Sequence, residues 1–524
     1  MDDGLICREI LSRISSQPEN GARLQQIKIE VCRRHGASTI PKNSEILAAA
    51  DPDERHRFES ILRLKPSRTI SGVAPVAIMT SPAPCPHGRC LPCPGGPDHP
   101  FASPQSYTGE EPAALRARQH GYDPADQVHG RLRQYREIGH PVDKVDLIVM
   151  GGTMTARPQA YQAGFVGAAV AAMNRYPGPP APKTGDLEEI FSENESAAVR
   201  CIGITFETRP DWCRRTHIET MRTLGVTKVE LGIQHLDDAI LAFNRRGCTV
   251  DDGVTANRLL RDAGLKVGFH VMPNLPGATP DDDRRMFVDL FGDERFRPDF
   301  LKIYPTLVTE GTEIEDLWRT GEYTPYPEEE LVDLIAGAKS NLPGYVRLQR
   351  VQRDIPARCI VAGSRHSNFR QLARRRLEER GGECRCIRCC EAGRHPPGGV
   401  PEITVHHYRC AGGDEIFIRA GTDRSLIGFA RLRIPDEPFE AALESTAMLR
   451  ELHVYGAMVR LGEKAGPGEW QHTAHGERLL AAAEAHATDQ GCRGIAVMSG
   501  IGVRPYYRER GYTRTGPYMC KDLR

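Results

Sequence analysis

The sequence lacks the two kinds of segment that direct a protein into a membrane or a secretory route. Its 524 residues contain no apolar run near the length of about 20 residues that spans a bilayer. The opening MDDGLICREI shows no charged region followed by an apolar stretch, which is the pattern of a secretory signal. We therefore expect a cytoplasmic protein with no membrane partner, in a compartment that keeps cysteines reduced.

Net charge is also lacking, because 69 Lys and Arg residues balance 69 Asp and Glu residues. Any affinity for nucleic acid must then come from local patches of positive charge. The chain has no internal repeat and no long low-complexity tract. Its length suggests about two to four domains, and its 40% of apolar residues can build sizeable cores.

Cysteine, in contrast, is abundant, with 16 residues of which about half are clustered. Three of them fall in the stretch CPHGRCLPCPGG, at Cys85, Cys90 and Cys93. In a reducing compartment such a cluster indicates metal ligands rather than disulfides. Zinc would need a fourth ligand, such as His87 or His99. A [4Fe–4S] cluster held by three thiolates leaves one iron open to chelate S-adenosylmethionine, and we favour it. Zinc and a loop of idle cysteines remain as alternatives.

Residues from Met1 to about Ser71 are expected to be helical. The stretches ICREILSRI and ARLQQIKIEVCRR place apolar residues at helical spacing with Arg and Lys between them. This segment is either a small helical cap on the next domain or a surface for tRNA or a partner.

Short apolar runs then alternate with helix-like segments, as in a parallel α/β sheet or partial barrel. The first run, VDLIVM, leads directly into Gly151, Gly152 and Thr153, where backbone amides can meet a ligand. Further runs begin at Cys201, Lys228, Lys266 and Asp299. Ligands of such sheets lie at the carboxyl ends of the strands. As a set, the polar residues expected there are Glu207, Thr208, Arg209, Gln234, His235, Asn274 and Lys302.

A second cysteine group, in GGECRCIRCCEAGRH, follows these strands. Cys384, Cys386 and Cys389 predict a zinc site that pins a polar linker, and a reduced cysteine-rich loop is the alternative. The fourth ligand stays open among Cys390, His395, Cys359 and His366. Nine arginines against four glutamates from Arg365 to Arg394 indicate either a solvated face or a contact to RNA phosphates.

Several motifs, in order, resemble the radical S-adenosylmethionine half of the catalytic subunit of Elongator, a family that also occurs as a stand-alone prokaryotic protein. They are CPHGRCLPCPGG, HPVDKVDLIVMGGTM, GITFETRPDWC, KVELGIQH, HVMPNLPG, KIYPTLV and RVQRDIP. The resemblance runs from about residue 75 to the C-terminus. The four-residue gap between Cys85 and Cys90 suits this family, whereas Pro92 stands where an aromatic residue usually precedes the last cysteine.

The C-terminal part alternates like antiparallel strands in EIFIRAG, SLIGFARLRI and RELHVYGAMVRL. The following turn, helix, strand and tyrosine resemble an N-acetyltransferase domain of the GNAT type, in which amides at a helix N-terminus hold the coenzyme A pyrophosphate. Ala474 replaces a glycine that is usual in this turn. By resemblance, the acetyl-CoA contacts are Lys144, Glu451, Leu452, His453, Val454, His475, Gly476, Glu477 and Tyr507.

The resemblance implies an α/β fold in four parts. They are a helical segment for tRNA or a partner (1–74), a radical S-adenosylmethionine partial barrel (75–360), an arginine- and cysteine-rich linker (361–399) and a GNAT-type domain (400–524). Its implied cofactors are a [4Fe–4S] cluster, S-adenosylmethionine near Gly151, Gly152, Thr153 and Glu207, the co-substrate acetyl-CoA, and Zn²⁺. Its implied partners are tRNA and an electron-donor protein, and the oligomeric state is left open.

The activity that the resemblance implies is modification of the wobble uridine of tRNA. A 5′-deoxyadenosyl radical takes a hydrogen from the methyl group of acetyl-CoA, and a carboxymethyl group is installed on carbon 5 of uridine. Lys144 would then belong to a site that the two domains share, although a surface lysine is the alternative. A protein lysine acetyltransferase with a structural cluster, using Glu451 or Tyr507 as base, is the second hypothesis. A tRNA-binding scaffold without turnover is the third.

Overall fold

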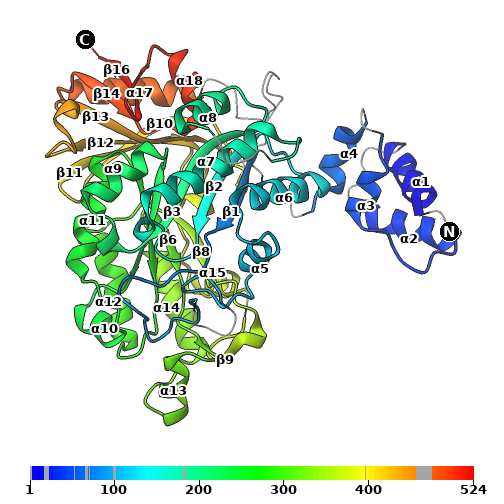
Figure 1. Cartoon of the computed structure of the whole chain (residues 1–524), viewed down its shortest axis with the longest axis horizontal. Coiled ribbons are helices and arrows are strands. Elements are labelled where there is room, and N and C mark those ends of the chain that lie inside the picture. The colour runs from blue at the N-terminus through cyan, green and yellow to red at the C-terminus, as the bar shows by residue number, and fades with distance from the viewer. Residues whose placement is uncertain are drawn as a thin grey trace.

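The computed structural model describes residues 3–16, 23–51, 54–64, 69, 71–97, 102–180, 185–366, 368–395, 397–455 and 475–523. Two seven-stranded sheets dominate it, one above the other in Figure 1. The first is entirely parallel, in the order β1-β2-β3-β4-β5-β6-β8. Its strands are β1 (Val73–Met79), β2 (Lys144–Met150), β3 (Arg200–Thr208), β4 (Lys228–Gln234), β5 (Lys266–Val271), β6 (Phe300–Ile303) and β8 (Arg347–Val351).

Helices connect the parallel strands, and most of them cover the outer face of the sheet. They are α5 (Pro112–Gln119), α6 (Pro124–Glu137), α7 (Gln159–Arg175), α8 (Leu187–Asn194), α9 (Arg215–Thr223), α10 (Asp238–Phe243), α11 (Val250–Asp262), α12 (Pro280–Gly292), α13 (Glu313–Thr320), α14 (Glu328–Ser340), α15 (Phe369–Glu379) and α16 (Ile387–Cys390). A small pair, β7 (Val308–Thr309) and β9 (Ile360–Ala362), lies beside them, and α13 packs beside this pair instead. This order of elements confirms the predicted partial barrel.

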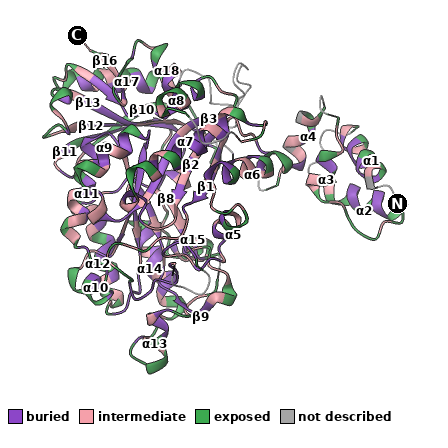
Figure 2. Cartoon of the chain, in the orientation of Figure 1, coloured by how far each residue is buried: buried purple, intermediate pink, exposed green. Residues whose placement is uncertain are grey.

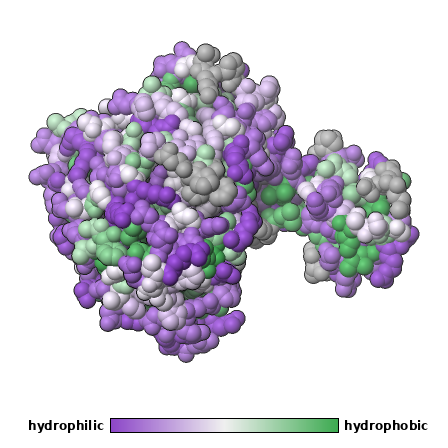
Figure 3. Space-filling model, turned by 60° about the horizontal axis from the view of Figure 1, so that its bottom comes forward, coloured by the Kyte–Doolittle hydropathy of each residue, from purple (hydrophilic) through white to green (hydrophobic). Residues whose placement is uncertain are grey.

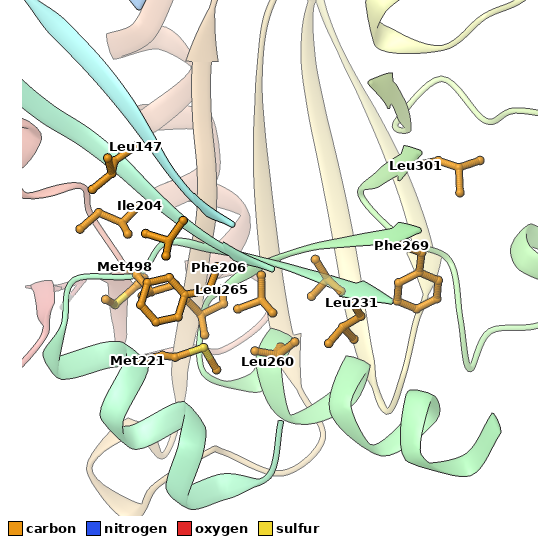
Figure 4. Close-up of a cluster of buried hydrophobic side chains, with 14 of the residues drawn as sticks. Leu147, Ile204, Phe206, Met221, Leu231, Leu260, Leu265, Phe269, Leu301 and Met498 are labelled. Atoms are coloured by element: carbon orange, nitrogen blue, oxygen red, sulfur yellow. The ribbon is translucent and has the colours of Figure 1, made fainter. Parts of the chain in front are cut away.

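The outer face of the sheet forms the main hydrophobic core. Leu147, Phe206, Leu231 and Phe269 are buried there and belong to the same hydrophobic cluster as Met221 and Leu260 of the covering helices (Figure 4). Because side chains of a strand alternate between two faces, the residues between these apolar positions point into the barrel. That inner face carries charged residues, where barrels usually hold Val, Ile and Leu. They are Asp146, Glu207, Lys228, Glu230, Lys266 and Lys302.

The second sheet is mixed and has the order β10-β11-β12-β13-β14-β16-β15. Its strands are β10 (Glu402–Arg409), β11 (Gly413–Gly421), β12 (Leu426–Pro435), β13 (Thr446–Val454), β14 (Gly494–Val497), β15 (Thr513–Thr515) and β16 (Tyr518–Asp522). Helix α17 (His475–Asp489) packs on one face, and α18 (Arg504–Arg508) follows β14. Phe417, Phe429 and Met448 join the core of the barrel from the other face. Ala474 lies outside the described residues.

The second sheet closes the amino end of the barrel. Arg450 of β13 donates to the carbonyl of Leu265, just before β5, at 3.1 Å. Arg347, the first residue of β8, donates to the hydroxyl of Tyr455 at 2.9 Å. The carboxyl ends of the parallel strands therefore point away from this sheet. The charged interior of the barrel lies between its amino end and its carboxyl end.

Helices α1 (Asp3–Ser15), α2 (Leu24–Arg34), α3 (Asn43–Ala48) and α4 (Arg55–Leu62) form a separate small unit with its own core. It stands apart from the rest and meets it near α6 (Figures 1 and 3). Arg63 donates to the carbonyl of Gly139 at 2.8 Å across this junction. None of the described helices is long and apolar enough to cross a membrane.

Candidate functional site

The cysteine loop lies at the carboxyl end of the barrel, between the loop after β4 and the turn after β2. Leu91 donates its amide to the carbonyl of Asn244 at 3.2 Å. The His87 ring lies between two thiols, with Nδ1 3.1 Å from Cys85 Sγ and Nε2 3.0 Å from Cys90 Sγ. Burial, reinforced by the Arg209 and Arg246 guanidiniums, lowers the pKa of His87 to about 4, so this ring is neutral near pH 7.

Each thiol of this loop has a polar neighbour from another segment. Gln105 Nε2 donates to Cys93 Sγ at 3.0 Å, and Thr153 Oγ1 lies 3.5 Å from Cys85 Sγ. The Arg246 guanidinium lies against the Cys90 thiol. These donors stabilise thiolates, which are the usual ligands of an iron–sulfur cluster. The residues present therefore fit such a cluster.

The spread of the three thiols argues against a single metal ion in this loop. Tetrahedral zinc with Zn–S bonds of about 2.3 Å places its sulfurs about 3.8 Å apart. Within the described residues, two groups of three bring all their ligand atoms within 4.8 Å of one another, and Cys85, Cys90 and Cys93 form neither group. A cubane spaces its thiolates more widely than one ion does, so the geometry favours the cluster.

The glycine turn after β2 packs directly against this loop. Gly151 and Gly152 have φ values of +114° and +96°, which residues with a Cβ rarely adopt. Thr80 Oγ1 donates to the Gly151 carbonyl at 3.0 Å, and a Cβ on Gly151 would come within 2.6 Å of that hydroxyl. Thr153, next in the turn, reaches Cys85. The expected methionine site of the cofactor therefore adjoins the cysteines.

A chain of buried charges runs inward from the same end. Tyr107 donates to Glu207 Oε2 at 2.9 Å, and Lys302 Nζ lies 3.1 Å from Glu207 Oε1. Lys302 also pairs with Glu230, which contacts Lys228 Nζ at 3.1 Å. Burial opposes ionisation of Glu230, yet Lys302 and Lys228 hold its pKa well below the usual value. His270 Nε2 is 3.0 Å from the same carboxylate.

Sequence reasoning placed Glu207 and Lys302 at this site but missed Lys228, Glu230 and His270. The sequence of β4, KVELGIQ, does indicate Lys228 and Glu230, because these polar residues alternate with Val229, Leu231 and Ile233. Glu207, Glu230 and His270 also form the second group that could hold a metal, but the Lys302 ammonium already lies between the two carboxylates.

The other strand-end residues separate into different environments. Arg209 is buried beside the cysteine loop and bonds Asp211 and the carbonyl of Arg246. His235 Nε2 lies 3.5 Å from Asp283 Oδ1, and the backbone N–H of Asn274 donates to Asp283 Oδ2 at 2.8 Å. The structure therefore joins Glu207 and Lys302 and places His235 and Asn274 in a structural group near α12.

The charged interior continues to the amino end of the strands. Asp146 and Lys266 lie there, and burial raises the pKa of Asp146 and lowers that of Lys266. The main attraction on Lys266 comes from Glu451 of β13, which accepts from Arg431 Nε at 2.8 Å. Lys144, the half-buried first residue of β2, lies at this same end.

The residues expected to contact acetyl-CoA lie where β13 leaves its neighbour. Strand β13 pairs with β14 only from Thr446 to Leu449, so in the described part of the chain Glu451, Leu452, His453 and Val454 have no partner on that side. His475, Gly476 and Glu477 form the first turn of α17, and a Cβ on Gly476 would lie 3.7 Å from Val454. Tyr507 is buried in α18. Among the described residues, strand backbone without a neighbour on one side thus adjoins a helix N-terminus.

The second cysteine group converges tightly. Cys384, Cys386 and Cys389 bring their sulfurs within 4.8 Å, as a tetrahedral metal requires. Hydrogen bonds from Cys384 and Cys389 hold the pKa of Cys386 well below its usual value. Cys390 donates instead to the Arg385 carbonyl at 3.5 Å. Of the candidate fourth ligands, none of Cys390, His395, Cys359 and His366 joins this group in the described residues.

A groove of about 1580 Å³ opens beside these cysteines, between the linker and the second sheet. Seven arginines and Lys339 line it against three acidic residues; the arginines are Arg370, Arg374, Arg385, Arg388, Arg394, Arg419 and Arg424. Burial, together with neighbouring arginines, lowers the pKa of Arg388 to about 10. The cations in this groove repel one another, so the groove suits a polyanion.

Comparisons with known proteins agree with this architecture. Three family models match: the ELP3 N-terminal domain over residues 4–70, the Radical SAM superfamily over 85–291 and the Radical_SAM C-terminal domain over 298–379. A relative named tRNA uridine(34) acetyltransferase, from Methanocaldococcus infernus, is 44% identical over 536 residues, which cover 99% of each chain. Elongator complex protein 3 of Homo sapiens is 39% identical over 518 residues, which cover 96% of this chain and 93% of that protein.

A solved structure of the archaeal Methanocaldococcus infernus Elp3 with an N-terminal deletion superimposes with a TM-score of 0.75 at 40% identity. It covers 87% of this chain and 100% of that chain. The identity extends over almost the whole length of the relatives, through both sheets and the helical unit, and confirms the resemblance found in the sequence. The chain belongs to the Elp3 family of Elongator.

Proposed function

We propose that this protein modifies the wobble uridine of tRNA and that its two sheets build one composite site. The observation that carries the proposal is the charged interior of the barrel. It extends from Tyr107 and Glu207, beside the cysteine loop, to Asp146 and Lys266, beside Glu451. The names of the relatives, tRNA uridine(34) acetyltransferase, support uridine 34 as the target.

The protein groups at each end support separate parts of one reaction. A cluster with S-adenosylmethionine supplies a carbon radical when bound, and acetyl-CoA supplies the two-carbon unit of the carboxymethyl group. Cys85, Cys90 and Cys93 would hold the cluster, with the Gly151 turn beside them. The free backbone of β13 and the first turn of α17 would hold the coenzyme. Lys144 would contact it from the barrel.

Lys302 and Tyr107 would hold the Glu207 side chain in one position at the cofactor end. Tyr107 follows Gln105 in the loop that contacts Cys93, so the carboxylate is tied to the cysteine loop on one side. Lys302 ties it to Glu230 on the other. The second sheet covers the amino end of the barrel and would exclude water from a radical formed inside.

The test uses protein purified without oxygen, reconstituted with iron and sulfide, and incubated with S-adenosylmethionine, acetyl-CoA and unmodified tRNA. We expect 5-carboxymethyluridine and 5′-deoxyadenosine, measured by mass spectrometry of nucleosides. Cys90→Ser should abolish both products. Lys144→Ala should reduce modification and acetyl-CoA hydrolysis while deoxyadenosine formation continues, because Lys144 lies at the other end of the barrel from the cysteines.

Other outcomes separate the alternatives. Modification that survives Cys90→Ser rules out the radical route. Acetylation of protein lysines without deoxyadenosine supports the lysine acetyltransferase, and tRNA binding without either product supports a scaffold. If Lys144→Ala changes neither hydrolysis nor modification, the shared site is wrong.

We also propose that zinc occupies Cys384, Cys386 and Cys389 and that the adjoining groove binds the phosphates of tRNA. Arg385 and Arg424 lie at the groove with 77% and 86% of their side chains exposed. Replacing both by Glu should weaken tRNA binding and lower the slope of log Kd against log salt by about two. Arg295→Glu is the control, because Arg295 is exposed on the barrel. An unchanged slope in the double variant contradicts binding of tRNA in the groove.

The proposed zinc is tested separately, by metal analysis of the purified protein with mass spectrometry.

A further inference from the structure

Arg246 is a buried cation that pairs with no carboxylate among the residues that the structure describes. The residue is 6% exposed, its Nη2 donates to the Gly232 carbonyl at 2.5 Å, and within the described residues no Asp or Glu pairs with it. Its Nε has no hydrogen-bond partner in the described part of the chain. Arg209, which is equally buried next to it, bonds Asp211 through two nitrogens at 2.9 Å each. An unpaired buried charge is strongly unfavourable, so Arg246 indicates that an anion belongs beside it.

The groups that face this cation are the cysteine thiols. The Arg246 guanidinium contacts Cys90, and the thiols of Cys248 and Cys85 lie nearby. The backbone next to Arg246 packs closely on the cysteine loop, because a Cβ on Gly247 would lie 2.9 Å from the His87 side chain. The Arg209 guanidinium also holds the Arg246 carbonyl at 2.8 Å. The cation is therefore held in place against the loop.

Gln105 supplies a second, uncharged donor on the other side of the loop. It is 8% exposed and donates from Nε2 to Cys93 at 3.0 Å. Its side chain packs under two glycines, because a Cβ on Gly96 would lie 2.7 Å from Gln105 Oε1 and one on Gly152 would lie 3.1 Å from its Cβ. The amide therefore has little freedom to turn away from the sulfur.

We propose that Arg246 and Gln105 set the reduction potential of the iron–sulfur cluster held by Cys85, Cys90 and Cys93. Reduction by a one-electron donor adds one negative charge to the buried cluster and its thiolates. A fixed positive charge and a hydrogen bond to sulfur both stabilise that charge and raise the potential. The inference rests on the proposed function only in requiring a cluster in this loop.

The test is a potentiometric titration of reconstituted protein with dithionite, followed by electron paramagnetic resonance of the reduced cluster. We expect Arg246→Gln to lower the equilibrium constant for reduction of the cluster about tenfold or more. For one electron, a tenfold decrease moves the midpoint potential by about 59 mV to more negative values. Arg246→Lys should restore much of the shift. Arg245→Gln is the matched control, because Arg245 is 61% exposed and pairs with Glu313.

A second pair of variants tests the hydrogen bond independently. Gln105→Leu removes the N–H donor and should shift the potential in the same direction by a smaller amount, whereas Gln105→Glu should shift it further. Iron and sulfide content per chain shows whether a variant still holds its cluster. If Arg246→Gln loses the cluster, Gln105→Leu decides the question.

The inference is overturned if the midpoint potential of cluster-loaded Arg246→Gln equals that of the wild type. If Arg246→Gln holds no cluster, an unchanged midpoint potential of Gln105→Leu overturns it. A wild-type protein that takes up no cluster overturns the proposed function instead. An intact cluster with an unshifted potential leaves the proposed function standing, so the two failures are distinguishable.

Discussion

At the scale of single residues, Glu230 is the centre of the charged interior. It is 2% exposed and meets Lys228, Lys302 and His270. Removing one partner of a buried ion pair leaves the others uncompensated, at a cost of about 3 to 5 kcal/mol. We therefore expect Glu230→Gln to lose stability of this order at pH 7, measured by urea denaturation. Glu219→Gln, on the exposed surface of α9, should change it by less than about 0.5 kcal/mol.

The pH dependence of this difference follows from the depressed pKa of Glu230. A carboxyl whose folded pKa is lowered contributes stability above its unfolded pKa and loses it as pH falls through the folded value. The advantage of the native chain over Glu230→Gln should then persist at pH 4.5 and shrink only below it. An advantage that has already vanished at pH 4.5 contradicts the proposed ion-pair network.

At the scale of elements, the turn after β2 depends on a backbone conformation that residues with a Cβ rarely adopt. Gly151→Ala forces a Cβ into the positive-φ region and toward Thr80, so we expect the turn to rearrange. Binding of S-adenosylmethionine, measured by calorimetry on cluster-loaded protein, should weaken at least tenfold. Gly164→Ala is the matched control, since Gly164 is exposed in α7 with open space around it and should gain stability. Equal affinities in the two variants would exclude a role for the turn.

The elements also show what the sequence can predict. The runs VDLIVM and CIGITFET are apolar on the face covered by helices, and their strands form as expected. Strand β8, RLQRV, was missed as a strand because its inward residues are polar and its length is five residues. Edge strand β10 was missed because most of its side chains are exposed (Figure 2). Periodicity finds strands with one buried apolar face.

Sites formed by segments far apart in sequence are harder to predict. The motif NRRGC places Arg245 and Arg246 side by side with no pattern to distinguish them. One is on the surface and the other faces the cysteine loop, and tertiary contacts such as the packing of Gly247 against His87 distinguish them. The cysteines themselves were found because three thiols in one short loop need no tertiary information.

At the scale of the whole molecule, a buried network of charges joins the two sheets. Asp299 before β6 bonds Arg450 at 2.7 and 2.8 Å, and Glu415 of β11 bonds Arg450 at 2.6 Å and Arg261 of α11 at 3.1 Å. Arg433 of β12 bonds Asp262 at 2.5 Å. These groups are nearly inaccessible to water, and they come from both halves. Neither half can unfold alone without exposing or unpairing them.

We therefore expect the two halves to unfold together, with far-UV circular dichroism and tryptophan fluorescence giving coincident transitions in guanidinium chloride. Glu415→Gln leaves Arg261, Arg433 and Arg450 short of one carboxylate and should cost about 3 to 5 kcal/mol. Asp414→Asn, its half-exposed neighbour on β11, should cost less than about 1 kcal/mol. An early separate transition of the C-terminal domain in the native chain would show that the network does not couple the halves. The proposed composite site would then lack the rigid frame it needs, because the two ends proposed to hold the coenzyme and the cluster could move independently.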